Sequence, residues 1–101
     1  MNNIPKSVQM ECGLMNIQKI MHMLNPKKAD NWVLMYKVFT EETIKTDVTE
    51  WQRTYHNLRP KDEYVMIYEW DSKALLYVVN VSAESVMYAL SNVMKLLADK
   101  F

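Results

Sequence analysis

Residues 62–81 of this 101-residue chain read DEYVMIYEWDSKALLYVVNV. Two runs in this stretch, 64–70 and 75–81, consist mainly of β-branched and aromatic residues, which favour strands. The residues between them, 71–73, are polar and typical of turns. The stretch therefore predicts a β-hairpin, about 63–81, at the centre of a small antiparallel sheet.

Both sides of this hairpin are apolar. In the first run Tyr64, Met66 and Tyr68 alternate with Val65 and Ile67. An antiparallel sheet with one solvated face normally carries polar residues on that face. Either helices cover both faces of the sheet, or another chain covers one of them.

The segment before the hairpin predicts a helix over about 7–24, capped by Ser7. Its apolar residues recur at spacings of three and four: Met10, Leu14, Ile17, Met21 and Leu24. An alternative is a strand over 8–12 that ends at Gly13, with the helix starting at Leu14.

Residues 32–40 alternate as a strand does, although a helix starting at Asp30 also fits their spacing. Residues 27–30 form a polar link, and residues 41–45 allow a turn and a short strand.

Two further helices are expected. Asp47 and Glu50 resemble a capping box for a helix over about 47–58. Val48, Trp51, Tyr55 and Leu58 would share its inward face. Ser82 would cap a last helix over about 82–100, with Met87 and Met94 on its apolar face.

These elements predict a single α+β domain over residues 1–101. A small antiparallel sheet of three or four strands would pack with three helices, about 7–24, 47–58 and 82–100.

Composition argues against several classes of function. Twelve basic and twelve acidic residues give a formal net charge of zero, which argues against a protein whose main task is gripping nucleic-acid phosphates. A single glycine argues against phosphate-binding loops. Nine methionines suit both core filling and adaptable binding surfaces. The opening residues are polar and lack an apolar signal core, so a cytoplasmic location without membrane contact is expected.

Catalytic and metal-binding candidates are weak. Cys12 lies ten residues from His22 on the same predicted helix, about 15 Å along its axis and outside hydrogen-bond reach. We therefore expect Cys12 to be buried and inert, and His56 to be a half-exposed helix residue. No catalytic residue, metal ligand or cofactor is predicted.

The sequence favours a non-enzymatic protein that covers a partner's surface, such as a small adaptor, inhibitor or immunity-type protein. The expected contacts are aromatic residues and an acidic segment: Tyr68, Trp70, Tyr88, Glu41, Glu42, Asp47 and Glu50. The partner is another protein, with homodimer formation as one option.

An alternative function is nucleic-acid binding or transcription regulation. Residues 51–61 interleave aromatic and basic side chains: Trp51, Arg53, Tyr55, Arg59 and Lys61. Such residues stack on bases and hold phosphates. The acidic residues just before this segment weaken the case.

Overall fold

The computed structural model describes residues 3–101; Met1 and Asn2, the first part of the polar opening segment, lie outside the described residues. The elements in chain order are α1 (Lys6–Leu24), α2 (Pro26–Asn31), β1 (Trp32–Val38), α3 (Thr43–Thr46), α4 (Glu50–Tyr55), β2 (Glu63–Glu69), β3 (Leu75–Asn80) and α5 (Val86–Ala98). The predicted α+β class is confirmed.

The sheet of the described chain has the antiparallel order β1-β2-β3. The predicted hairpin is confirmed, but only its first strand, β2, is central. Met66 of β2 pairs with Met35 on one side and with Val78 on the other. Both β1 and β3 are therefore edge strands.

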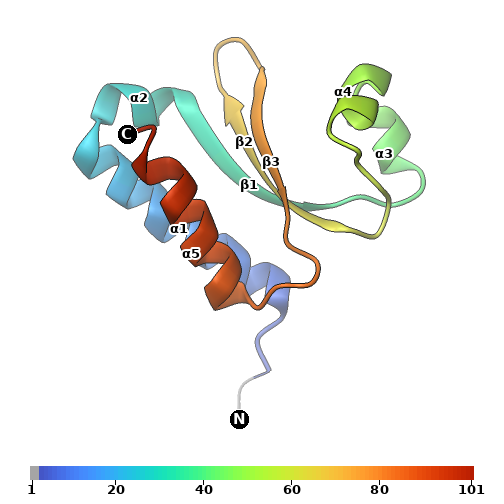
Figure 1. Ribbon diagram of the computed structural model, residues 1–101, viewed down its shortest axis with the longest axis horizontal. Coiled ribbons are helices and arrows are strands. Elements are labelled where there is room, and N and C mark those ends of the chain that lie inside the picture. The colour runs from blue at the N-terminus through green and yellow to red at the C-terminus, as the bar shows by residue number, and fades with distance from the viewer. Residues whose placement is uncertain (1–2) are drawn as a thin grey trace.

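Helices cover the two faces of the sheet unequally (Figure 1). Helices α1 and α5 lie side by side on one face, where Val65 and Ile67 enter the larger core cluster. The short α3 and α4 lie on the other side, where Tyr64 and Met66 join a smaller cluster. The larger cluster consists of Met10, Leu14, Ile17, Met21, Ala29, Trp32, Val65, Ile67, Val81, Ala89, Val93 and Leu97. The smaller one consists of Phe39, Ile44, Val48, Leu58, Tyr64 and Met66. Cover on both sides explains why both sides of the hairpin are apolar.

Helix α1 is continuous, so the alternative strand over 8–12 is wrong. The predicted stripe is buried from Met10 to Met21, whereas Leu24 is exposed. The helix follows Pro5, and Ser7 does not cap it. Gly13 faces Leu90 of α5, and a Cβ at this position would lie 2.2 Å from Leu90 Cδ1. The lack of a side chain at Gly13 lets α1 and α5 approach closely.

Two segments that were expected to be a link and a short strand are helical instead. The supposed link 27–30 belongs to α2, where the Asn25 side chain accepts a hydrogen bond from the Lys28 N–H and proline stands at the first turn. The supposed strand at 41–45 overlaps α3. Thr40 and Thr43 exchange side-chain to backbone hydrogen bonds at its start.

The other two predicted helices are shorter than expected. Helix α4 is capped by a Thr49–Gln52 capping box, rather than by Asp47 and Glu50. Helix α5 is capped by Ser85, while Ser82 Oγ instead accepts the Glu63 N–H at 2.7 Å. This bond ties the loop before α5 to the start of β2. Met87 and Met94, predicted on the apolar face of α5, are exposed.

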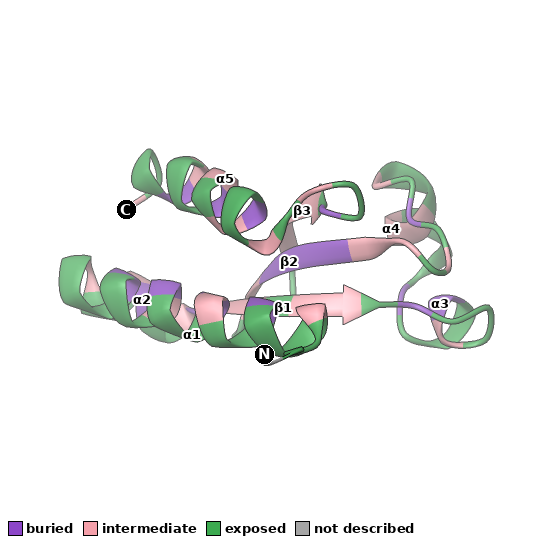
Figure 2. Ribbon diagram, turned by 90° about the horizontal axis from the view of Figure 1, so that it is seen from below, coloured by how far each residue is buried: buried purple, intermediate pink, exposed green. Residues whose placement is uncertain are grey.

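The molecule is thin, with principal extents of 42 × 37 × 17 Å. Figure 2 shows buried residues where the helices face β2, and exposed residues over the outer sides of the helices. Within the described residues, the helices are too short or too polar to cross a bilayer.

Candidate functional site

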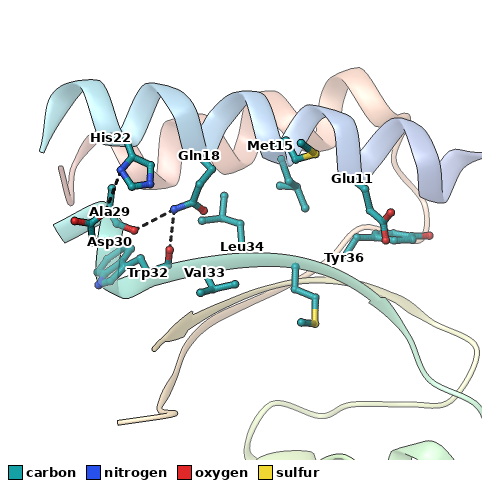
Figure 3. A pocket seen from close by; sticks show the side chains of 12 residues that line it. Glu11, Met15, Gln18, His22, Ala29, Asp30, Trp32, Val33, Leu34 and Tyr36 are labelled. Carbon is teal, nitrogen blue, oxygen red and sulfur yellow. Dashed lines mark hydrogen bonds and ion pairs between the residues drawn. The ribbon is translucent and has the colours of Figure 1, made fainter. Parts of the chain in front are cut away.

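A groove of about 560 Å³ lies between α1 and the outer edge of β1 (Figure 3). Leu14 and Met15 line it from the helix, and Leu34 lines it from the strand. At one end Gln18 Nε2 donates to the carbonyl oxygens of Ala29, at 3.1 Å, and Trp32, at 2.8 Å. The groove is thus mainly apolar, with polar groups at its ends.

Charged and hydroxyl groups mark the two ends of the groove. His22 Nδ1 lies 3.3 Å from Asp30 Oδ1 at one end. At the other end, near Glu11, the Tyr36 hydroxyl donates to Glu63. Burial raises the pKa of Tyr36, and the hydrogen bond and negative charge of Glu63 raise it further. Tyr36 is therefore a neutral donor, held in place by Glu63.

A second surface lies on the segment that contains α3 and α4. Trp51 and Tyr55 stack on each other there, with ring centroids 4.8 Å apart and an interplanar angle of 10°. They are 66% and 69% exposed, so the expectation that both point inward is wrong. His56 meets the Tyr55 ring edge-on at 4.9 Å, and burial lowers the pKa of His56. We call Trp51 and Tyr55 the aromatic pair.

The predicted acidic residues precede the aromatic pair along the chain, and all four are exposed. Glu50 is in the first turn of α4, next to Trp51. Asp47 forms an ion pair with Lys37 at 3.5 Å. Glu41 and Glu42 line a shallow depression of about 600 Å³ with Lys61 and the apolar residues Val38 and Phe39.

The other predicted partner contacts are dispersed. Tyr68 is half-buried beside the smaller cluster, and burial, followed by the charge of Asp47, raises its pKa. Trp70 is 59% exposed at the hairpin turn, with Lys73 Nζ 3.7 Å from its ring centroid. Tyr88 is exposed near the start of α5, which follows the opposite end of β3. Tyr68, Trp70 and Tyr88 therefore do not form one patch.

The residues of the nucleic-acid alternative are only partly available. The aromatic pair is accessible, and Arg59 and Lys61 are exposed. The Arg53 guanidinium, in contrast, donates to the carbonyl oxygen of Ile44 at 3.3 Å and so supports α3.

Cys12 is exposed, so the expectation of a buried cysteine is wrong. His22 lies on α1 beside Asp30, and His56 caps the C-terminal end of α4 beside Tyr55. Among residues 3–101, no group of three or more histidine, cysteine, aspartate or glutamate side chains is arranged to hold a metal ion.

The groove along β1 was not predicted, because the pattern of residues 32–40 does not reveal which strand they pair with. Trp51 and Tyr55 were assigned to the inside because the predicted helix extended over about 47–58, whereas α4 spans Glu50–Tyr55. The available signal for the groove was Met15 itself, an apolar residue of α1 with the charged Glu11 and Lys19 four residues before and after it. No protein-family model, curated protein or solved structure matches this chain.

Proposed function

We propose that the protein is a non-enzymatic interaction module that binds and covers the surface of a different protein, as small adaptors, inhibitors and immunity-type proteins do. The observation that carries this proposal is the exposed, stacked pair of Trp51 and Tyr55. Burial of a large, exposed aromatic side chain against a partner lowers the free energy of the complex. Tryptophan and tyrosine are also enriched among the residues that dominate protein interfaces.

The surroundings of the aromatic pair support a protein partner with a basic surface. Glu41, Glu42, Asp47 and Glu50 give this segment four carboxylates before the first ring. An aromatic centre with a charged rim is the usual anatomy of a specific interface. The carboxylates would accelerate association with a positively charged partner and would repel nucleic-acid phosphates.

Stacking also prepares the pair for binding. The two rings already hold each other in one orientation, so less side-chain entropy is lost when a partner covers them. The pair belongs to α4, which lies on the side of the sheet opposite α1 and α5 (Figure 1), and neither ring belongs to a core cluster. Alanine at these positions should therefore leave the fold intact.

The test is affinity capture from the native host, compared across variants. Trp51→Ala and Tyr55→Ala should each abolish recovery of the same protein, and Glu50→Lys should reduce it more at low salt than at high salt. Met87→Ala, on an exposed part of α5, is the matched control. If the same protein is still recovered with both the Trp51→Ala and the Tyr55→Ala variant, the aromatic pair is not its binding surface.

Trp70 and Tyr88 are separate candidate anchors. Trp70→Ala and Tyr88→Ala, tested against the same captured protein, determine whether the interface extends to the hairpin turn or to α5. Both residues are exposed, so each substitution is expected to preserve the melting temperature.

Nucleic-acid binding is the second candidate, because the aromatic pair is accessible and Arg59 and Lys61 are exposed nearby. Filter binding of single-stranded oligonucleotides at low and moderate salt tests it. Phosphate contacts are strongest at low salt, so absence of binding there would dismiss this function.

A further inference from the structure

The outer edge of β1 offers unpaired backbone groups. The Asn31 carbonyl accepts the Trp70 N–H, and the Phe39 carbonyl accepts the Lys61 N–H. Because hydrogen-bonding direction alternates along a strand, odd-numbered residues of β1 face β2 and even-numbered residues face outward. Trp32 is already satisfied, since its N–H donates to Ala29 and its carbonyl accepts from Gln18.

Leu34 and Tyr36 thus direct N–H and C=O groups outward, and no described residue pairs with them there. Such an edge is a template for another extended segment. The two residues flank Met35, which is the midpoint of β1 (Trp32–Val38). A two-fold axis through Met35 would pair Leu34 with the partner's Tyr36, and Tyr36 with the partner's Leu34. Each pair would exchange two hydrogen bonds.

Exposed methionines lie on both faces at this midpoint. Met35 is 41% exposed on the face away from α1. Met15 is 61% exposed on α1, and Figure 3 places it between Leu34 and Tyr36 along the strand. The same axis would bring Met15 against the partner's Met15 and Met35 against the partner's Met35. Methionine adapts readily to such self-packing.

Charges on α1 have the complementary pattern. Glu11, Met15 and Lys19 are spaced by four residues, so they form one ridge on the helix. Two α1 helices related by this axis run antiparallel. Glu11 then faces the partner's Lys19, and Lys19 faces the partner's Glu11. On β1, Val33 rather than a second lysine stands opposite the partner's Lys37.

The chain also exposes more surface than its size requires. Its accessible surface is 6868 Å², whereas a compact monomer of 12.0 kDa exposes about 6,000 Å². The excess is comparable to the roughly 800 Å² that each partner buries in a standard interface.

We propose that two copies of this chain form a two-fold dimer, in which their β1 edges pair antiparallel about Met35 and their α1 helices pack through Met15. The result is one continuous six-stranded sheet. The aromatic pair takes no part in this dimer. Failure of the dimer would therefore leave the proposed partner binding unaffected, and failure of partner binding would leave the dimer unaffected.

Light scattering after size exclusion at low salt, over a range of concentrations, tests the dimer. The wild type should approach twice 12.0 kDa as concentration rises. Glu11→Lys creates two Lys–Lys contacts by symmetry, and Lys19→Glu creates two Glu–Glu contacts. Each should raise the dimer Kd by about tenfold or more. Mixing the two variants should restore the dimer, because every contact across the axis becomes Lys–Glu.

Met35→Lys is the independent test of the strand edge, since it places two lysines against each other on the opposite face. Met87→Lys, at an exposed position on α5 and away from both β1 and α1 contacts of the dimer, is the control and should not change the Kd. Circular dichroism confirms that each variant is folded. A monomeric wild type at all concentrations would overturn the proposal. So would a dimer that neither charge reversal nor Met35→Lys weakens, because it would use another surface.

Discussion

Replacing Lys6 with methionine should lower the free energy of unfolding by about 2 kcal/mol, because its ammonium group joins three segments. Lys6 Nζ donates to the carbonyl oxygens of Val81, at 3.0 Å, and Glu84, at 2.9 Å. It also lies 3.3 Å from Glu63 Oε1. One side chain thus links the start of α1 to β2 and to the loop before α5.

The magnitude follows from these three contacts and their solvation. The side chains of Lys6 and Glu63 are 30% and 22% exposed, so water weakens each contact relative to a fully buried one. About 0.5–1 kcal/mol for each contact gives roughly 1.5–3 kcal/mol in total. Methionine keeps the aliphatic stem of lysine, so packing changes little and the loss reports on the charge.

Urea unfolding at one fixed protein concentration measures this loss, and a fixed concentration keeps any self-association constant. A loss of about 2 kcal/mol corresponds to a fall in Tm of roughly 8–16 °C for a domain of this size. Lys95→Met, at an exposed position on α5, is the control and should change stability by less than about 0.5 kcal/mol. If Lys6→Met behaves like this control, the contacts of the ammonium make no net contribution.

Two further predictions concern ionisation and packing. The pKa values of Tyr36, Tyr64 and Tyr68 are raised above that of free tyrosine, mainly by burial, so the folded state keeps phenol protons that the unfolded chain releases above about pH 10. The free energy of unfolding should therefore fall as pH rises through that region. An alkaline absorbance titration should show these three tyrosines ionising at higher pH than the others, or only on unfolding. Simultaneous titration of every tyrosine in the folded protein would contradict this. Gly13→Ala should change the free energy of unfolding little in the wild type, since about 1 kcal/mol of helix propensity is offset by displacement of Leu90. In a Leu90→Ala background the same substitution should stabilise by about 1 kcal/mol in urea unfolding, and an equal effect in both backgrounds would show that the contact has no cost.

The sequence was sufficient where the pattern was long or chemically marked. The β2–β3 hairpin follows from two β-rich runs around a polar turn, and α1 follows from a stripe of four buried residues. Helices α2, α3 and α4 have six, four and six residues, too few for a helical period to emerge. Their presence depends on local caps such as Thr49 with Gln52.

The site was harder to foresee, because exposure is a tertiary property. Val48 and Leu58 are buried as predicted, but they flank α4 rather than belong to it. The short helix is therefore free to turn Trp51 and Tyr55 outward. Likewise, the composition of β1 does not reveal which of its edges pairs with β2, and the groove exists only because the outer edge is left open.

The two core clusters on opposite faces of the sheet have a consequence for local unfolding. None of the residues of α4 is buried, and the smaller cluster is held together by Phe39, Ile44, Val48 and Leu58 around the sheet. This unit can detach while α1 and α5 remain packed, so its amides should exchange with solvent before those of β2. The aromatic pair therefore belongs to a unit that we expect to open before the larger core does. A partner that bound the aromatic pair would slow amide hydrogen exchange across residues 39–58.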